Sequence, residues 1–406
     1  MDAPHPLPLA NTRILAIEQM QAMPYATQLL AHLGAEVVKV EHPVHGESGR
    51  SAAPQILDDD GNRVGATYLR NNLGKSSIGL DLKNPEAIAL IKRLVPHYDA
   101  VVENFKPGTM ERLGLGYEVL SELHPPLVYA SVSGFGSLLP TPYRDWPAYV
   151  AVAEAMGGLN AFRPEPGRKP IIGVAGALGD IGSGLFAAVG ILAALNGARA
   201  TGIGQRVDVA MMDAVIALID MLPFHPSIGV TDNQLSAWPG ICTSFAAKDG
   251  LFIMQVGREH QFERMAHALG KPEWLEDERF ASREGWRDHL DEVIRPVLEA
   301  WASDKTKIEV CQLLADQGIV AGPIFDGDDI VNDPHVKSHD MVLSIERPDA
   351  ETPLHVVGNP VKLSRSPARE VERWPRLGAD TDAILKHDLG LSQEELARLR
   401  EAGAIR

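Results

Sequence analysis

A single carboxylate stands where the sequence has its clearest chemical pattern. Asp180 follows the glycine-rich run 171–179 and precedes a nearly unbroken apolar run from Leu185 to Leu195. This pattern predicts a loop that delivers Asp180 to the first turn of a buried helix ending near Gly197. Because glycine lets a substrate approach the backbone closely, Asp180 is a candidate nucleophile.

A structural role for Asp180 is also consistent with the pattern. An Asp at a helix start often caps the helix by accepting a backbone N–H, and the helix dipole favours its charge. Caps are common and carboxylate nucleophiles are rare, so the bare pattern favours the cap. The two roles do not exclude each other, and a helix start should keep Asp180 ionised near neutral pH.

Composition narrows the classes of protein that fit. The chain has 406 residues, of which 45% are hydrophobic, and a net charge of −16, which argues against a nucleic-acid surface. Cys242 and Cys311 are far apart and lack metal-ligand spacing, so we expect no metal and a reduced, cytoplasmic setting. The N-terminus lacks a signal-peptide pattern, and the apolar run Leu185–Leu195 is too short to span a bilayer. We therefore expect a soluble protein.

The first half of the chain alternates between strand and helix patterns. Thr12–Glu18 reads as a strand, a turn and helix follow, and a second strand begins near Ala35. Further strands are expected at Ser77–Leu80, at Ala100–Glu103 and in the segment PLVYASVSGFG, with helices near Asn84 and Thr109. This alternation predicts an α/β fold with a parallel, doubly wound sheet. The dinucleotide signature G-x-G-x-x-G is missing from the first turn, which weakens a nicotinamide or flavin interpretation.

The pattern changes after residue 225. Shorter strands, a turn at 248–250 and helices near Gln261–Leu269 and Glu292–Leu314 predict a smaller α+β domain over 226–328. The last part reads as a strand and a terminal helix. We therefore expect a large domain made of residues 1–225 and 329–406, with the smaller domain between them.

Several segments resemble one family, the class III CoA-transferases, also called the CaiB/BaiF family. The resemblance covers nearly the whole chain and is carried by MPYATQLLAHLGAEVVKVEHP, GKSSIGLDLKNPEA, VVENFKPGTMERLGLGYEVL, VSGFG, QVGREHQFERMAHALGKPEWL, AGPIF and VVGNPVKLSRSP. It is densest in GDIGSGLFAAVGILAALNGARATGIGQRVDVAMMDA, which contains Asp180. The order and spacing of the segments together make the resemblance specific.

The resemblance implies a fold, an assembly and a reaction. The fold would be a Rossmann-like large domain with a parallel sheet built from both chain ends, plus the small domain, in an interlocked homodimer. Asp180 would attack an acyl-CoA donor to give a mixed anhydride. The released CoA thiolate would then form an aspartyl-CoA thioester, and the carboxylic acid acceptor would reverse the sequence. Formyl-CoA transferase and related acyl-CoA:carboxylate CoA-transferases are the members it resembles.

The resemblance also implies residues that contact coenzyme A. CoA carries phosphates, so cations are candidates: Lys106, Arg112, His42, Lys75 and Arg50, the last two being more simply solvated surface charges. Gln21 would lie near the thioester or act only as a turn residue. The set expected to contact CoA is Gln21, Ala22, His42, Leu80, Asn104, Phe105, Arg112 and Tyr149.

Two departures from the family pattern limit what the resemblance implies. An acidic residue commonly follows the tyrosine matched by Tyr149, but Val150 stands there. Glu154, one turn later, could face the same way, although a helix-surface charge is the simpler interpretation. The loop that shields the intermediate in formyl-CoA transferases has at best a short counterpart around Trp238–Gly240, which disfavours oxalate or formate as substrates.

The alternative within the family is an α-methylacyl-CoA racemase, which needs an acid and a base beside the α-carbon. Such members carry a histidine upstream of the helix at Tyr149, where this chain has Asp145 and no His between 125 and 224. A non-catalytic CoA-binding protein would be expected to lack Asp180. The sequence does not identify the two acids that exchange CoA. Arg258 and His260 could recognise a second carboxylate or simply lie on the surface.

Overall fold

The computed structural model describes residues 6–161, 176–229, 240–366, 369, 371 and 373–406. These residues form two compact units. The larger contains the described residues before 232 and those from Lys337 to Arg406, and the smaller contains those from 240 to Val336. The boundaries expected at 226 and 328 lie a few residues before these positions.

The larger unit is built on a six-stranded sheet in which all neighbouring strands are parallel. The strand order is β5-β2-β1-β6-β7-β8. The bounds are β1 Arg13–Ile17, β2 Glu36–Glu41, β5 Ser76–Gly79, β6 Ala100–Glu103, β7 Val128–Ser133 and β8 Arg206–Ala210. The predicted α/β class and parallel sheet are confirmed, because alternating short apolar strands and helices leave few other ways to bury both sheet faces.

Helices cover both faces of this sheet. In β1, Ile14 and Ala16 belong to a core shared with helices α1 (Ala22–His32) and α7 (Leu178–Thr201). Leu15 and Ile17 point the other way, into a core shared with the helices α3 (Pro85–Leu94), α15 (Thr381–Leu389) and α16 (Gln393–Glu401). Because side chains alternate along a strand, two buried faces require strands that are apolar at nearly every position.

The larger unit also contains shorter elements around the sheet. Two antiparallel hairpins pair β3 with β4 and β12 with β13. The bounds are β3 Gln55–Leu57, β4 Arg63–Gly65, α2 Ala66–Asn71, α4 Thr109–Arg112, α5 Tyr117–Leu123, α6 Val150–Met156, α8 Met211–Leu218, β12 Val342–Ile345 and β13 Leu354–Val357.

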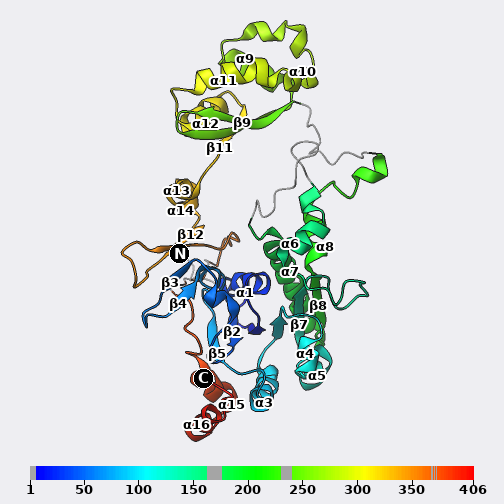
Figure 1. Cartoon of the computed structure of the whole chain (residues 1–406), viewed down its shortest axis with the longest axis vertical. Helices are drawn as coiled ribbons and strands as arrows, with labels where there is room; N and C mark the ends of the chain where they lie inside the picture. Colours follow the sequence, from blue (N-terminus) through cyan, green and yellow to red (C-terminus); the bar gives the residue numbers. More distant parts are fainter. Residues whose placement is uncertain (1–5, 162–175, 230–239, 367–368, 370, 372) are drawn as a thin grey trace. The chain divides into compact units, whose positions relative to one another are not determined.

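Helix α7 is longer than the sequence pattern predicts. It continues through Gly197 and ends at Gly202, whose left-handed backbone (φ 73°) is a common helix stop. Figure 1 shows α7 beside α6 and α8, both of which contact it. Among the described helices it is the one long and apolar enough to cross a membrane by length and composition, but half of its most apolar window is buried. Core helices of soluble proteins have the same character.

The return segment after Lys337 supplies helices but no strand of the six-stranded sheet. The strand predicted near Val356 exists as β13, and it pairs with β12 instead. Leu385, Leu396 and Ile405 nevertheless lie in the core on one sheet face. Both chain ends therefore build the larger unit, but the expectation that both contribute to its parallel sheet is wrong for the described residues.

The smaller unit is an antiparallel sheet packed against helices. Its strand order is β11-β10-β9, and the predicted turn at 248–250 joins β9 to β10. Its core contains the stacked rings of Phe262 and Trp286. The bounds are β9 Ile241–Ala247, β10 Gly250–Val256, α9 Glu259–Ala268, α10 Arg283–Asp288, α11 Arg295–Ala302, α12 Lys307–Asp316, β11 Val320–Pro323, α13 Gly327–Asn332 and α14 Pro334–Ser338, within which the boundary between the units falls.

Candidate functional site

Asp180 lies in the first turn of α7, as its sequence pattern predicts. The glycine-rich run just before it, residues 171–175, lies outside the described residues. Asp180 is not the N-cap: that position belongs to Ala177, which has no side chain to cap the helix. The carboxylate of Asp180 is thus left available for chemistry, at a helix end whose N–H groups favour negative charge.

The surroundings of Asp180 change its titration. The pKa of its carboxyl is raised from 3.8 to about 6, mainly by burial and in addition by the Glu154 carboxylate, while Arg70 opposes both effects. Desolvation outweighs the helix dipole here, so the pKa of Asp180 lies above its ordinary value rather than below it. With a pKa of about 6, the carboxyl is still mostly ionised at neutral pH.

Glu154 is the neighbour of Asp180 that sequence reasoning placed wrongly. It is on α6 and only 2% exposed, so the prediction of a helix-surface charge is wrong. Its Oε1 accepts a hydrogen bond from the Gly179 N–H at 3.0 Å. Glu154 therefore caps α7 from a different helix. The residue that it bonds, Gly179, directly precedes Asp180.

The N-terminal turns of α7 pack closely on the start of α1. A Cβ on Gly184 would lie 2.6 Å from the Ala22 carbonyl oxygen and 3.0 Å from Cδ1 of Tyr25, so only glycine allows this approach. Arg70, on α2, lies 5.9 Å from the centre of the Tyr25 ring. The predicted neighbours Gln21 and Ala22 are thus brought to the same end of α7 as Asp180.

Most of the residues expected to contact CoA directly follow a strand of the sheet. Gln21 comes after β1, His42 after β2, Leu80 after β5, and Asn104 with Phe105 after β6. Since neighbouring strands are parallel, these residues gather along one edge of the sheet, at its carboxyl end. Open α/β sheets bind ligands at that edge.

The amide of Asn104 is occupied by the chain's own backbone. Its Oδ1 accepts from the Gln19 N–H at 2.9 Å, and its Nδ2 donates to the Gln19 carbonyl at 2.8 Å. The next N–H, of Met20, donates to Glu47 Oε2 at 2.9 Å, and Met20 has a positive φ of 61°. Asn104 and Glu47 therefore fix the loop that leads into Gln21 and α1.

Removing the Asn104 side chain should loosen this loop. In Asn104→Ala the two polar backbone groups of Gln19 lose their partners, which costs about 1–3 kcal/mol. We expect hydrogen exchange of the Gln19 amide in the ligand-free protein to accelerate about tenfold or more. Arg112→Ala is the matched control, because Arg112 is exposed and, among the described residues, its side chain bonds Thr109 Oγ1 within its own helix. Equal exchange in both variants would contradict the assignment.

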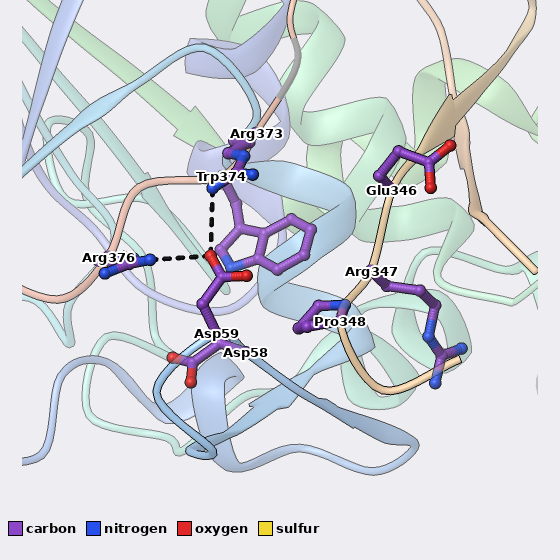
Figure 2. Close-up of a pocket in the computed structure, with 8 residues that line it drawn as sticks. All are labelled: Asp58, Asp59, Glu346, Arg347, Pro348, Arg373, Trp374 and Arg376. Atoms are coloured by element: carbon purple, nitrogen blue, oxygen red, sulfur yellow. Dashed lines mark hydrogen bonds and ion pairs between the residues drawn. The ribbon is translucent and has the colours of Figure 1, made fainter. Parts of the chain in front are cut away.

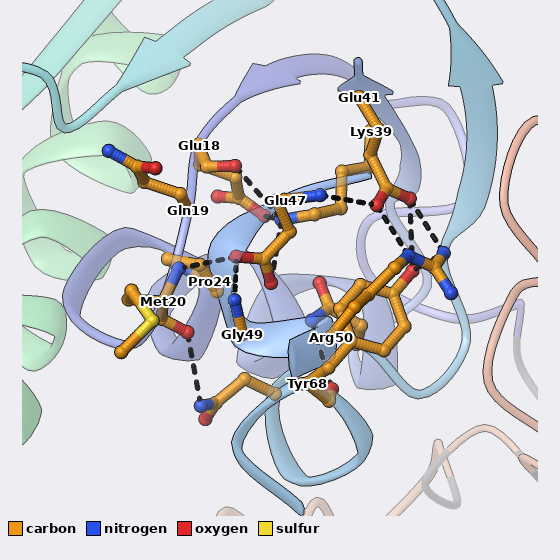
Figure 3. A network of polar contacts seen from close by, with 12 residues as sticks. Glu18, Gln19, Met20, Pro24, Lys39, Glu41, Glu47, Gly49, Arg50 and Tyr68 are labelled. Carbon is orange, nitrogen blue, oxygen red and sulfur yellow. Dashed lines mark hydrogen bonds and ion pairs between the residues drawn. The ribbon is translucent and has the colours of Figure 1, made fainter. Parts of the chain in front are cut away.

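A buried ionic network lies beneath the same loop (Figure 3). Lys75 Nζ contacts Glu18 Oε1 at 2.8 Å, and Lys39 Nζ donates to the Glu18 carbonyl at 3.1 Å. Arg50 pairs with Glu41, with 2.6 Å between Nε and Oε2. Lys75 is 6% exposed, so the prediction that Lys75 and Arg50 are solvated surface charges is wrong.

The described residues of the larger unit line at least two cavities, and Asp180 lines neither of these two. One, of about 260 Å³, lies between the β3–β4 hairpin and the return segment (Figure 2). Arg373 and Arg376 pair there with Asp59. The other, of about 430 Å³, is lined by His45, Arg50 and Arg406 among others. None of the residues expected to contact CoA lines either cavity.

Comparison with known proteins decides the family. The model of CoA-transferase family III matches residues 9–381. The chain belongs to CoA-transferase family III. A succinyl-CoA–D-citramalate CoA-transferase of Chloroflexus aurantiacus is 35% identical to this CoA-transferase, over 98% of each chain. A formyl-CoA:oxalate CoA-transferase of Rhodopseudomonas palustris is 32% identical, over 98% of this chain and 97% of its own.

A solved structure supports the same conclusion. A CaiB/BaiF family protein from Brucella suis superimposes on this CoA-transferase with a TM-score of 0.84 at 30% identity. The match covers 95% of this chain and 100% of the other. The predicted family and the predicted transferase activity are thus confirmed.

The residues expected to contact CoA differ in how they could do so. Leu80 and Ala22 are buried, and the Leu80 N–H donates to the Glu41 carbonyl at 2.8 Å. His42 is partly exposed, and its Nδ1 accepts from the N–H groups of Val44 and His45. Arg112 is exposed, Phe105 is partly buried, and Tyr149 is 84% exposed.

The sequence pattern did not identify three residues of the candidate site. Arg70 and Tyr25 reach the neighbourhood of Asp180 from α2 and α1, and Glu47 holds the backbone before Gln21. Nothing in the spacing of these residues relates them to Asp180. The packing of α1 against α7 brings Tyr25 to this CoA-transferase's candidate nucleophile, and the contact of α2 with α1 brings Arg70.

Proposed function

We propose that this enzyme moves CoA from an acyl-CoA thioester to a carboxylic acid acceptor through covalent intermediates on Asp180. The observation that carries the proposal is the position of Asp180 on the first turn of α7, uncapped and partly buried, with a pKa raised to about 6. Such a carboxylate is ionised at neutral pH and only partly solvated, as a nucleophile needs to be.

The reaction would proceed in two matched halves. A carboxylate oxygen of Asp180 attacks the thioester carbonyl, and the C–S bond breaks to give a mixed anhydride and CoA thiolate. The thiolate attacks the aspartyl carbonyl of the anhydride and releases the donor acid, which leaves an aspartyl-CoA thioester. The acceptor carboxylate then attacks this thioester and reverses both steps. The thioester's energy is conserved because water never takes part.

The chain's own groups suit the remaining tasks. N–H groups at the start of α7 can stabilise the oxyanion that forms at each step. We propose that Gln21, Ala22, His42, Leu80, Asn104, Phe105, Arg112 and Tyr149 form the surroundings of CoA. Asn104 would act through the loop it holds, whereas Arg112 is free to meet a phosphate.

Activity should depend on the ionisation of Asp180. Attack requires the carboxylate, and the pKa of Asp180 is about 6. We therefore expect kcat/KM for the donor to be level above pH 7 and to fall about tenfold per pH unit below about pH 6. A pH–rate profile at saturating acceptor measures this. A profile that stays level down to pH 4 would contradict it.

We propose that donor and acceptor are small carboxylic acids and leave their identity to experiment. The relatives named above act on succinyl, citramalate, formyl and oxalate groups, and most of these carry two carboxylates. Arg258 and His260 are exposed at the start of α9 and are candidates to recognise a second carboxylate. The loop around Trp238, expected to shield the intermediate, lies largely outside the described residues.

We propose that the working form is a cytoplasmic homodimer. Leu185, Phe186 and Val189 are apolar yet exposed on α7, and Val189 is 65% exposed. Exposed apolar patches of this kind mark protein interfaces. Light scattering should give twice the mass of the chain, and Val189→Asp should shift it toward the monomer.

Mass spectrometry of trapped intermediates tests the proposed reaction. The protein is incubated with succinyl-CoA, formyl-CoA and other acyl-CoAs, quenched with hydroxylamine or borohydride, and compared with Asp180→Ala. A modification on the Asp180 peptide that is absent from the variant supports covalent transfer and identifies the donor. No adduct with any thioester, together with solvent deuterium entering the α-carbon of a branched acyl-CoA, would instead establish the racemase alternative.

A further inference from the structure

Helix α7 begins without a cap of its own. Its N-cap residue, Ala177, offers no side-chain acceptor, and the Gly179 N–H is instead bonded by Glu154 Oε1 at 3.0 Å. One turn further on, the buried Ser183 Oγ donates to the Gly179 carbonyl. Both polar backbone groups of Gly179 are thus held by buried side chains, immediately before Asp180.

The close approach of α6 to this turn favours a glycine at position 179. A Cβ on Gly179 would lie 3.0 Å from Val150 Cγ2, 3.2 Å from Glu154 Cγ and 3.3 Å from Val215 Cγ2. These contacts come from both α6 and α8 and are tighter than most Cβ contacts, so a larger residue would require these side chains to shift by a few tenths of an ångström. The close packing sets the distance at which Glu154 meets the first turn of α7.

Glu154 places a buried carboxyl group at this position. It is 2% exposed, and within the described part of the chain no lysine, arginine or histidine forms an ion pair with it. A neutral glutamine would make the same hydrogen bond to Gly179 without the cost of burying a charge. The presence of a carboxylate therefore calls for an explanation beyond capping.

We propose, on the basis of the function proposed above, that Glu154 is a positioning residue for Asp180. Its carboxylate holds the first turn of α7 from the neighbouring helix and places a negative charge beside the nucleophile. The charge repels ionised Asp180 but exerts no such repulsion once Asp180 is part of a neutral anhydride or thioester. Glu154 therefore favours the covalent states over the free carboxylate.

The other charged groups around Asp180 fit this role. Arg70 on α2 opposes the effect of Glu154, and burial acts in the same direction as Glu154. Tyr25 on α1 borders the same end of α7, and its own pKa is raised by burial. On α8 the first-turn carboxylate is Asp213, which is exposed.

Two variants separate the two parts of the proposal. Glu154→Gln keeps an acceptor for Gly179 and removes the charge, whereas Glu154→Ala removes both. We expect Glu154→Gln to leave exchange of the Gly179 amide unchanged and to lower the pH midpoint of kcat by about half a unit to one unit. We expect Glu154→Ala to accelerate that exchange about tenfold and to lower kcat about tenfold or more, with KM for the donor within about twofold.

Asp213→Asn is the matched control, since it removes an exposed carboxylate from a neighbouring helix. Asp213→Asn should change neither the pH midpoint of kcat nor hydrogen exchange of the Gly179 amide. The proposal would be overturned if Glu154→Gln left the pH midpoint of kcat unchanged and Glu154→Ala left both kcat and exchange of the Gly179 amide unchanged. It would also be overturned if Glu154→Ala lost activity only through a higher KM.

A measurement without turnover separates this proposal from the proposed function. The titration of Asp180 is followed by NMR of the selectively labelled carboxyl carbon in wild type and Glu154→Gln. If the midpoint moves down but no acyl-CoA is turned over or forms an adduct, the positioning role stands and CoA transfer on Asp180 fails. If adducts form and the midpoint does not move, transfer stands and the role of Glu154 fails.

Discussion

Asp180→Asn should lower CoA transfer at least about 1,000-fold, because an amide cannot form the anhydride and no other described carboxylate shares its place on α7. Binding of the acyl-CoA should be retained, since the substitution is nearly isosteric. The rate is measured with the donor identified by trapping, and binding by calorimetry. A variant that keeps more than a tenth of wild-type activity would contradict the assignment of the nucleophile.

The same variant should be more stable than wild type at neutral pH. The pKa of Asp180 is about 6 in the folded protein, against 3.8 for the ordinary group. Between these values the folded state holds a proton that the unfolded state releases, so wild-type stability falls as pH rises from about 4 to 6. At pH 7 we expect the free energy of unfolding of Asp180→Asn to exceed that of wild type by up to about 3 kcal/mol.

Denaturant unfolding at pH 4 and pH 7 checks this expectation. The gain should be present at pH 7 and mostly lost at pH 4, where the carboxyl is protonated in wild type as well. If the gain in the free energy of unfolding were equal at both pH values, its cause would be packing rather than the charge of Asp180.

Glu18→Ala should be the most destabilising change in the ionic network. Glu18 is fully buried, and its removal leaves Lys75 and Lys39 without the carboxylate that both contact. Uncompensated buried charges cost about 3–5 kcal/mol. Urea unfolding at pH 7 measures the loss in the free energy of unfolding.

Arg398→Ala provides the control for an exposed ion pair. Arg398 contacts Glu86 at 2.9 Å, but both side chains are largely in water. We expect a loss below about 1 kcal/mol. If Glu18→Ala cost no more than Arg398→Ala, the network would contribute nothing to the stability of the sheet edge.

Strands were predictable from this sequence because burial on both faces leaves a strong signal. The segment Ala100–Glu103 is apolar up to its last residue and appears as β6 with those bounds. The end of α7 was not predictable from Gly197, because a glycine can continue a helix at a modest cost, and the left-handed turn falls at Gly202.

The candidate site was predictable only in part. Asp180 and the strand ends at His42 and Asn104 were found by motif. Glu154 and Lys75 were misplaced because charged residues are usually exposed, and their burial depends on partners distant in the sequence. Arg70 became a neighbour of Asp180 only through tertiary packing, which no local pattern encodes.

The packing of α15 and α16 on the sheet has a consequence for synthesis. Leu385 and Leu396 complete a core that begins with Leu15, so the part of this sheet face that α3 does not cover stays open until the ribosome has made nearly the whole chain. At about 10 residues per second this interval lasts roughly 40 s. We expect the nascent chain to need chaperones during that time, and stalled products ending before α15 to aggregate.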